Sequence, residues 1–384
     1  MIINSDTTNK CMNLKDFKTT KERREFLEEN LKIKLETISK AHVDEEKTIH
    51  CENLIGATIL PLGVAGPLEI KGEYVKGGFY IPLATTEGAL VASVSRGCKA
   101  INLSGGARVY LEKVGTTRGP VFETSGLEES IKFKRWLENN FNLLKVEAEK
   151  TSSYLKLRKL ETNIVGTYIY VRFYFDTKEA MGMNMATIAS DVIAKYIEQK
   201  TKVKCLSISG NFCIDKKPAW LNFISGRGKR VWAEAILKKE TVKEVLKTTP
   251  EKFFEVWFAK CLIGSAMSGS LGFNAHFANI VAAFFAATGQ DLAHVVEGSM
   301  GITTSKVLKN GDLYVSVYLP AVMIGTVGGG TKLKTKQEAL SIIGAKNSNE
   351  LAEVLGGAVL AGEISLLASL AEGTLAKAHE KLGR

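Results

Sequence analysis

The order of predicted strands and helices between residues 119 and 207 restricts the fold of this chain more than any other feature. Runs of β-branched and aromatic residues predict strands, and helical spacing of apolar residues, with Ser125 as a cap, predicts the intervening helices. The predicted elements are a strand at 119–124, a helix at 125–145, strands at 154–164 and 166–175, a helix at 180–200 and a strand at 203–209. This β-α-β-β-α-β order is the ferredoxin-like, or split βαβ, arrangement, and it predicts a small domain over residues 119–207.

The segments on either side of this small domain are rich in glycine and alanine. A small-residue helix is expected at 88–101, and further helices are expected at 228–238, 241–262, 276–288 and 351–370. They predict a large, mostly helical domain formed by 56–118 and 219–384, which the small domain interrupts. Residues 208–218 would connect the two domains, and residues 1–55 would form a helical arm with a helix over 14–40. The expected class is α+β.

The chain carries a net charge of +10, from 51 Lys and Arg against 41 Asp and Glu. Such an excess fits nucleic acid, an anionic membrane surface or small acidic ligands. The densest charged segment, 15–47, holds as many acids as bases, which is typical of a solvated amphipathic helix. Zinc-finger spacing, a basic-leucine pattern and RNA-binding aromatic motifs are missing from the sequence, so we expect no nucleic-acid partner.

Membrane and export signals are also missing from the sequence. The apolar stretch at 278–290 is shorter than the roughly 20 residues of a spanning helix, and 351–372 contains Glu353 and Glu363. The N-terminus lacks the basic and apolar regions of a signal peptide, so we expect a cytoplasmic protein without a membrane segment. Six scattered cysteines, with no CxxC pair and no histidine at zinc spacing, predict neither disulfides nor a metal site.

Two carboxylates stand where packing alone does not require a charge. Glu87 directly precedes an apolar helix, where an acid complements the helix dipole, and this structural role stays open beside a catalytic one. Asp291 follows the apolar helix at 276–288, at the end where a carboxylate opposes the dipole. It therefore requires a cationic partner, and a lysine held between carboxylates could polarise a carbonyl oxygen.

A polar loop and a terminal histidine are the other candidate sites. In the loop SGNFCIDKKPA, Ser209, Asn211 and Asp215 offer groups that orient a polar acid, although a lone DKKP also suits a solvated turn. His379 lies near the end of the chain, where a histidine usually has no role. It would serve as a proton donor if the tail folded over a site.

Two glycine-containing segments could hold a dinucleotide, although neither is the GxGxxG fingerprint. Residues 181–184 (MGMN) open the second helix of the small domain, and residues 325–331 are GTVGGGT. A helix N-terminus favours a pyrophosphate because its free N–H groups and its dipole attract anions. Met181, Met183 and Met185 suit core packing equally well. The residues alone indicate an enzyme-like protein that handles a phosphorylated or carboxylated ligand.

Taken together, these segments resemble the class I 3-hydroxy-3-methylglutaryl-coenzyme A (HMG-CoA) reductases. The matching runs, in order, are ENLIGATILPLGVAGPL, PLATTEGALVASVSRGCKAI, TRGPV, AMGMNM, SGNFCIDKKPA, GRGK, GSAMSGSLGFNAHFANIVAA, GQD and GTVGGGT. The series is far more specific than any one of its members. The segments ATTEGALVAS, SRGC and GTVGGGT are more similar in sequence to class I members than to class II members.

The resemblance implies a four-electron reduction in the mevalonate route to isoprenoids. HMG-CoA and two NADPH would give mevalonate, free CoA and two NADP⁺, through a mevaldyl-CoA hemithioacetal and mevaldehyde. Lys216 would stabilise the oxyanion at each hydride transfer, with Asp291 between Lys216 and Glu87 as the charge partner. Glu87 would supply a proton or tune the site. His379 would protonate the CoA thiolate as it leaves.

Other positions match family residues that bind the substrates. The match assigns HMG binding to Arg118, Ser209, Asp215, Lys217 and Asn279, with Asn279 supporting Lys216. It assigns CoA binding to Ser93, Arg96, Lys247 and Lys260. It assigns NADP(H) binding to Ser152, Ser153, Tyr154, Glu179, Ala180, Met181, Gly182, Met183, Asn184, Gly325, Gly328 and Gly329. The active site would lie between the subunits of a homodimer, which could assemble further into a tetramer.

Departures from the family pattern affect the cofactor. Residues 152–154 (SSY) stand where many class I members have Ser-Arg-Phe, so an arginine for the 2′-phosphate of NADPH is missing, and Glu179 replaces a common Asp. Lys156 or Arg158 could substitute, and NADH stays an alternative cofactor. A non-catalytic acyl-CoA-binding protein and an enzyme that oxidises mevalonate with NAD⁺ are the other open hypotheses. The chain retains residues at all four catalytic positions of the family, which argues against a non-catalytic acyl-CoA-binding protein.

Overall fold

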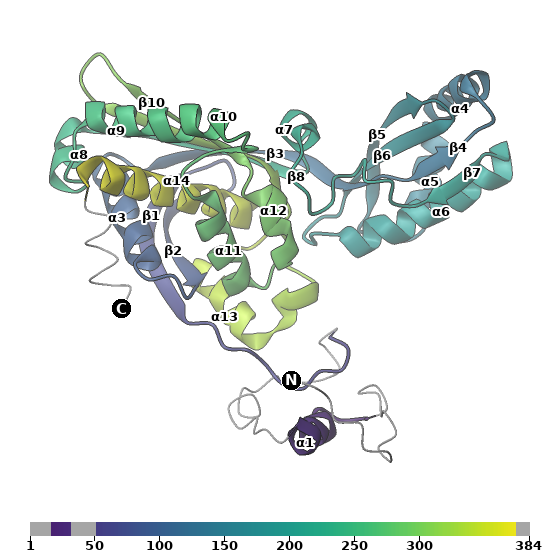
Figure 1. Cartoon of the computed structure of the whole chain (residues 1–384), viewed down its shortest axis with the longest axis horizontal. Helices are drawn as coiled ribbons and strands as arrows, with labels where there is room; N and C mark the ends of the chain where they lie inside the picture. The colour runs from purple at the N-terminus through teal and green to yellow at the C-terminus, as the bar shows by residue number, and fades with distance from the viewer. Residues whose placement is uncertain (1–16, 32–50, 374–384) are drawn as a thin grey trace.

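The computed structural model describes residues 17–31 and 51–373. Within the expected N-terminal arm it places one helix, α1 (Thr20–Leu31), and most of the remaining helix predicted at 14–40 lies outside the described residues. Figure 1 shows the rest of the chain as a larger and a smaller body joined by extended strands.

The smaller body contains the elements that follow residue 118. They are β4 (Val121–Glu123), α4 (Leu127–Asn139), α5 (Phe141–Glu149), β5 (Lys156–Val165), β6 (Tyr168–Asp176), α6 (Met183–Thr201) and β7 (Lys204–Ser207). With α4 and α5 taken together, their chain order is β-α-β-β-α-β. The strands lie in the order β7-β4-β6-β5, and neighbouring strands are antiparallel. Apolar side chains such as Phe122, Phe173 and Ile193 pack between the strands and the helices.

The larger body combines a second set of strands with helices. Its strands are β1 (Leu62–Lys71), β2 (Lys76–Ala84), β3 (Ala107–Arg118), β8 (Gly228–Leu237), β9 (Gly272–Phe273), β10 (Gly301–Val307) and β11 (Leu313–Val322). Its principal helices are α3 (Leu90–Leu103), α7 (Trp220–Ser225), α8 (Lys239–Glu244), α9 (Pro250–Trp257), α11 (Phe277–Thr288), α12 (Val295–Gly298), α13 (Lys334–Ile343) and α14 (Ser348–Glu372). It is a mixed α/β body, which differs from the mostly helical domain that we expected from the sequence.

One long strand, β3, belongs to both bodies. Its residues from Arg108 to Gly115 pair with β8, and its last three, Thr116 to Arg118, pair with β6. The resulting 11-stranded sheet runs β7-β4-β6-β3-β8-β11-β10-β9, with β1, β2 and β5 paired off this path. Figure 1 shows β3 running from the larger body toward the smaller one. The loop after β7 therefore returns to the larger body at the junction of the two.

The helix expected at 228–238 is strand β8. Val231, Ala233, Ala235 and Leu237 are buried, and the residues between them are more exposed. The prediction is wrong because alanine favours a helix by intrinsic propensity, whereas the alternation places four apolar side chains on one face of the sheet. The expected helix at 241–262 also divides, since α8 ends before Pro250 begins α9.

Helix α14 forms the core of the larger body (Figure 1). It is long and apolar enough to cross a membrane, but 83% of its apolar window is buried inside the fold. Its two inner carboxylates are satisfied by backbone donors. Glu353 accepts the N–H groups of residues 73–75, and Glu363 accepts those of residues 275–276. These bonds account for two glutamates inside an apolar helix.

Gly97 allows α3 to pack directly against α14. A Cβ atom at this position would overlap the carbonyl oxygen of Ala361 on α14. We expect Gly97→Ala to lower the free energy of unfolding by about 1–3 kcal/mol, because an added methyl group must push two buried helices apart. Urea unfolding measures the change. Gly126→Ala is the control, since a Cβ there meets nothing within 4 Å, and equal effects of both variants would contradict a tight helix contact.

Candidate active site

Lys216 and Asp291 form an ion pair near the junction of the two bodies. Lys216 lies in the loop between β7 and α7, and Asp291 caps the 3-10 helix η3 (Leu292–His294), where its Oδ1 accepts the Ala293 N–H at 3.1 Å. Lys216 Nζ is 2.8 Å from Asp291 Oδ2, and the side chains are 39% and 37% exposed. Burial raises the pKa of Asp291, but hydrogen bonds from Lys216 and Ala293 and the charges of His294 and Lys216 lower it overall. The pair is therefore ionised and open to a ligand.

A buried cluster of charges lies behind this pair. Arg227 is fully buried and forms ion pairs with Glu297, which is also fully buried, and with Asp215, whose Oδ1 is 2.9 Å from Arg227 Nη2. Arg227 Nε donates to Thr117 Oγ1 at 2.9 Å. The backbone N–H of Lys216 donates to Glu297 Oε1 at 3.3 Å. The loop that carries Lys216 is thus anchored to the cluster.

His294 completes the cluster and is fully buried. Its Nδ1 is 2.7 Å from Glu297 Oε1, and its Nε2 is 3.7 Å from Asp291 Oδ2. By donor type, Asp215, His294 and Glu297 could hold a metal ion, since their ligand atoms lie within 4.8 Å of one another. Arg227 already pairs with both carboxylates, however, so the set has its cation and does not fit a metal ion.

The residues expected to bind the acid group of HMG surround Asp215. Arg118 Nη1 is 3.6 Å from Asp215 Oδ2, and Arg118 Nε is buried without a hydrogen-bond partner. Lys217 Nζ donates to the Asp215 carbonyl at 3.3 Å. Ser209 lies in the same loop, with its Oγ 3.9 Å from Cys213 Sγ. Two cations therefore flank this loop, which suits the binding of a carboxylate.

Glu87 and Asn279 form a separate contact. Asn279 Nδ2 donates to Glu87 Oε1 at 3.0 Å, and Asn279 and Lys260 line a cavity of about 850 Å³. Within the described part of the chain, no hydrogen bond or ion pair joins Glu87 or Asn279 to the Lys216–Asp291 pair. This differs from the expectation that Asn279 supports Lys216 and that Asp291 lies between Lys216 and Glu87.

The four residues expected to bind CoA lie in different places. On α3, Ser93 Oγ donates to Ser365 Oγ at 2.9 Å, and Arg96 Nη2 donates to the Ser365 carbonyl at 2.6 Å. Both side chains are therefore turned toward α14. Lys247 and Lys260 are exposed, and no carboxylate of the residues that the structure covers lies within 4.0 Å of either. These two lysines are free to meet phosphates.

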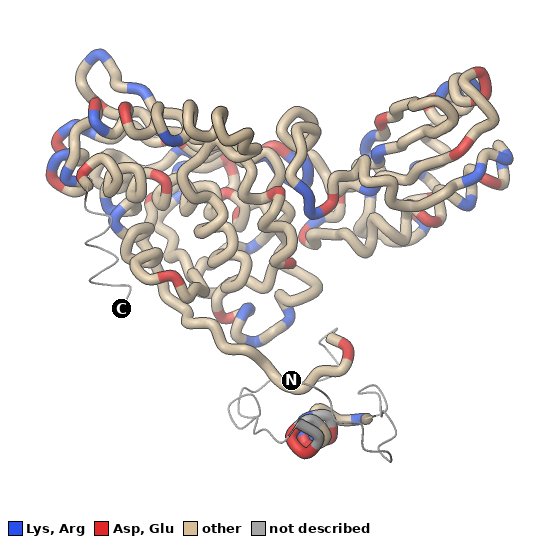
Figure 2. The backbone as a smooth tube through the Cα atoms, in the orientation of Figure 1, with Lys and Arg blue, Asp and Glu red and all other residues tan. Residues whose placement is uncertain are grey.

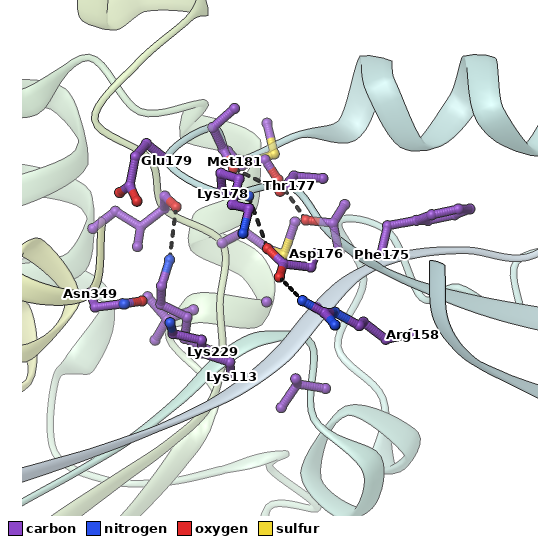
Figure 3. A pocket seen from close by; sticks show the side chains of 18 residues that line it. Lys113, Arg158, Phe175, Asp176, Thr177, Lys178, Glu179, Met181, Lys229 and Asn349 are labelled. Carbon is purple, nitrogen blue, oxygen red and sulfur yellow. Dashed lines mark hydrogen bonds and ion pairs between the residues drawn. The ribbon is translucent and has the colours of Figure 1, made fainter. Parts of the chain in front are cut away.

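A cavity of about 430 Å³ lies where the loop before α6 meets the larger body (Figure 3). Three of the expected cofactor residues, Glu179, Ala180 and Met181, line it. Its cationic lining residues are Lys113, Lys178, Lys229 and Arg158. Within the described residues 17–31 and 51–373, Arg158 is the only one of these four cations with a carboxylate within 4.0 Å. That carboxylate belongs to Asp176, at 2.6 Å. The cavity therefore offers positive charge that suits an anionic ligand.

The start of α6 carries three further expected cofactor residues. Gly182 caps the helix with a left-handed backbone, at φ 86°. Met183 is buried, and its Sδ is 2.8 Å from Arg227 Nη2, whereas Asn184 is exposed. The helix thus presents a glycine and its free N–H groups at the junction.

The remaining expected cofactor residues are exposed or pack beside the cavity. Gly325 lies against the loop at 179–181, where an added Cβ would lie 2.5 Å from Met181 N. Gly328 and Gly329 lie in an exposed turn with positive φ values of 84° and 53°. Residues 152–154 form a turn before β5, outside the cavity lining.

Lys229 is a buried lysine in the wall of this cavity (Figure 3). Burial lowers its pKa to about 8, and the charge of Lys113 acts in the same direction, while Glu179 and Asp176 oppose it. Glu179 is itself committed elsewhere, since its Oε2 accepts the Ser348 N–H at 2.6 Å. The folded chain therefore bears the free-energy cost of a buried charge at neutral pH.

The stability of the protein should rise in mildly alkaline solution because of Lys229. Above about pH 8 the folded chain releases this proton, while an unfolded lysine holds it to about pH 10.4, so the free energy of unfolding increases over that interval. Lys229→Met should remove the increase and stabilise the protein at neutral pH by on the order of 1–3 kcal/mol. Urea unfolding across this pH range measures both effects. The exposed Lys132→Met is the control, and an unchanged increase in Lys229→Met would contradict the assignment.

Three buried members of the charge cluster were not predicted from the sequence. They are Arg227, His294 and Glu297. A signal existed for two of them, because Asp291, His294 and Glu297 follow one another at three-residue steps, which places them on one face of a helical segment. Arg227 lies in the matching run GRGK, but no local pattern shows that its side chain is buried.

A lysine–carboxylate pair and a cation-lined cavity, placed where a small domain joins a large one, define an enzyme site for a polar, anionic substrate. The chain belongs to the hydroxymethylglutaryl-coenzyme A reductase family, whose model matches residues 19–384.

The 3-hydroxy-3-methylglutaryl-coenzyme A reductases of Methanothermobacter thermautotrophicus and Methanocaldococcus jannaschii are each 50% identical to this chain. The first match covers 94% of this chain and 92% of the relative, and the second covers 95% and 93%. A solved class II enzyme from Streptococcus pneumoniae, bound to NADPH in open conformations, shares the fold, with a TM-score of 0.70 at 20% identity over 92% of this chain and 97% of that one. The chain is thus an oxidoreductase of the mevalonate pathway that reduces HMG-CoA.

Proposed function

We propose that this reductase forms mevalonate at the junction of its two bodies. HMG-CoA, two NADPH and two protons give mevalonate, free CoA and two NADP⁺. The observation that carries the proposal is the Lys216–Asp291 pair, which is partly open and lies within the family-matching runs SGNFCIDKKPA and GQD. A mevalonate-oxidising direction uses the same groups, so the direction is an outcome of the experiment below.

The residues of the chain account for both reductive steps. A carbonyl oxygen gains negative charge in each step, and Lys216, kept charged by Asp291, stabilises it. The thioester first becomes a hemithioacetal, and its C–S bond then breaks to give mevaldehyde and a CoA thiolate. The thiolate takes a proton, which we assign by resemblance to His379, outside the described residues. Glu87, held by Asn279, supplies a proton or tunes the site during reduction of the aldehyde.

The residues around the junction cavity fit a pyridine dinucleotide. When bound, NADPH supplies the hydrides. Lys113, Lys178 and Lys229 line the cavity, and in the part of the chain that the structure describes no carboxylate lies within 4.0 Å of their Nζ atoms, so they are placed to hold its anionic groups. Gly182 begins α6 beside them and presents free N–H groups to a phosphate. We therefore assign NADP(H) binding to the small domain at 119–207 together with Lys113 and Lys229 at its junction with the large domain, and HMG-CoA binding to the large domain at 56–118 and 219–384.

The 2′-phosphate decides between NADPH and NADH. Lys156 and Arg158, the substitutes suggested by the sequence, are already paired with Glu149 at 2.9 Å and with Asp176 at 2.6 Å. Neither is free to bind a phosphate without leaving its carboxylate. We therefore assign the preference for NADPH to the cavity lysines.

We further propose a class I enzyme, a homodimer with a shared active site, and a cytoplasmic location. The relatives named above are 50% identical to the chain, whereas two solved Streptococcus structures are 20% and 18% identical. The separation of the Glu87–Asn279 contact from the Lys216–Asp291 pair supports a shared site, because a second copy could bring the two together. A sedimentation measurement tests the dimer, and a monomer with full activity would contradict it.

The test of the proposed function is the oxidation of reduced nicotinamide by the purified full chain. We expect HMG-CoA to drive the oxidation of NADPH, with two NADPH consumed for each CoA released. No oxidation of NADPH or NADH would overturn the proposal. A strong preference for NADH would overturn the cofactor assignment, and reduction of NAD⁺ or NADP⁺ by mevalonate and CoA alone would reverse the assigned direction.

A further inference from the structure

The carboxylate of Asp291 is held on both of its oxygens. Oδ1 accepts the Ala293 N–H at 3.1 Å. Oδ2 lies between two nitrogens, Lys216 Nζ at 2.8 Å and His294 Nε2 at 3.7 Å. The direction in which Oδ2 points therefore depends on His294 as well as on Lys216.

Glu297 fixes the ring of His294. The Glu297 carboxylate only accepts hydrogen bonds, so the 2.7 Å contact requires that His294 Nδ1 carries a hydrogen. Arg227 Nη1 is 3.4 Å from the same Nδ1, but both atoms are then donors, so this contact is not a hydrogen bond. Nε2 therefore faces Asp291, and it is buried with no hydrogen-bond partner among the residues described.

Glu297 also fixes the backbone of Lys216. It accepts the Lys216 N–H at 3.3 Å, and its own charge is balanced by Arg227, which is fully buried. The buried Glu297 carboxylate thus binds both the His294 ring, which faces Asp291, and the loop that carries Lys216. Asp215, at 3.9 Å from His294 Nδ1, is the remaining charged group that faces the ring.

We propose that His294 is a positioning residue for the reduction, which holds Asp291 beside Lys216 while Glu297 holds both His294 and the Lys216 backbone. The inference rests on the proposed roles of Lys216 and Asp291. When Lys216 turns toward the developing oxyanion, its bond to Asp291 weakens, and the ring keeps Oδ2 in place. Lys216 consequently meets the same partner in the second hydride transfer as in the first.

Two substitutions separate positioning from packing. His294→Gln keeps a side-chain N–H that can point toward Asp291, whereas His294→Leu keeps only the volume. We expect kcat for HMG-CoA to fall about 10- to 100-fold in His294→Leu and less in His294→Gln, with KM little changed, because a misplaced group loses rate and not binding. The acid limb of the kcat profile should move to higher pH, because loss of the charge of His294 raises the pKa of Asp291.

Glu353→Gln is the matched control for a merely structural effect. Glu353 is fully buried, as His294 is, but its carboxylate binds only the backbone N–H groups of residues 73–75. We expect this variant to unfold at a lower temperature while it keeps the wild-type kcat and acid limb. If both His294 variants also keep the wild-type kcat and acid limb, the inference is wrong.

A measurement on the unmodified protein does not depend on whether a variant folds. NMR of the full chain with isotope-labelled histidine reports which ring nitrogen of His294 carries a hydrogen, once the signal is assigned by its loss in His294→Gln. Hydrogens on both ring nitrogens support the inference, because the Nε2 that faces the Asp291 carboxylate can hold it only as a donor, and a bare nitrogen at either position overturns it. A wild-type chain that does not oxidise NADPH with HMG-CoA would contradict the proposed function instead, and the NMR result would still report on the ring.

Discussion

Lys216→Ala is expected to abolish both hydride transfers. Lys216 Nζ is the cation at the partly open pair, 2.8 Å from Asp291, and among the described residues it is the only lysine or arginine within 4.0 Å of that carboxylate. Loss of one preorganised charge at a developing oxyanion lowers kcat by about 10²–10³-fold, and here the loss acts on two consecutive steps. Oxidation of NADPH, measured with HMG-CoA and separately with mevaldehyde, should therefore fall to the background rate with both substrates.

Lys217→Ala is the matched control, because it removes the same charge one residue away. Among the described residues, Lys217 Nζ donates to the carbonyl of Asp215 and to no carboxylate, so we expect a raised KM for HMG-CoA and a much smaller loss of kcat. Retention of mevaldehyde reduction in Lys216→Ala would contradict a role in both steps. That pattern is instead the one expected for replacement of His379, whose proposed proton is needed only when CoA leaves.

Arg227→Met is expected to produce the largest loss of stability. Its guanidinium is fully buried and pairs with Glu297 and Asp215, so its removal leaves the buried Glu297 without its arginine and Asp215 paired only with Arg118 at 3.6 Å. Breaking a buried pair in this way lowers the free energy of unfolding by about 3–5 kcal/mol. Urea unfolding of the wild type and the variant at neutral pH measures the loss.

An exposed arginine provides the comparison. Arg108 Nη1 is 4.0 Å from Glu234, and its side chain is 75% exposed, so Arg108→Met should change the unfolding free energy by less than about 1 kcal/mol. The double variant Arg227→Met with Glu297→Gln should recover part of the loss, since one of the unpaired charges is also removed. Equal stability of the two single variants would show that the buried cluster does not depend on Arg227.

The small body was predictable from local patterns, whereas much of the larger body was not. The aromatic run predicted as a strand at 166–175 corresponds to β6 (Tyr168–Asp176), because its β-branched and aromatic residues indicate a strand within ten residues. Strand β8 was mistaken for a helix, and β10 (Gly301–Val307) and β11 (Leu313–Val322) were not predicted. Strand β8 pairs with β3 and β11, which are distant in sequence, and sheet pairing of this kind leaves little local trace, whereas β10 and β11 are neighbours that pair with each other.

In the candidate site, too, features with a local sequence signal were predicted, and features that depend on residues distant in sequence were not. An acid at the wrong end of the helix at 276–288 called for a cation, and Lys216 lies there in the structure. The cluster escaped prediction because Arg227 lies far in sequence from His294 and Glu297, and because the role of all three depends on their burial. The contact between Glu87 and Asn279 was not predicted, since it joins residues far apart in the chain.

The two glycines that face each other in β3 and β8 fix how the two bodies are joined. Gly115 and Gly228 pair where β3 leaves the larger body, at φ 106° and 66°. A Cβ atom at Gly115 would crowd the carbonyl of Phe175, and one at Gly228 would crowd the carbonyl of Val322, so only glycine fits this close backbone packing. A larger residue at either position would displace the smaller body (Figure 1) and its charged side chains (Figure 2) from the cavity beside Lys229.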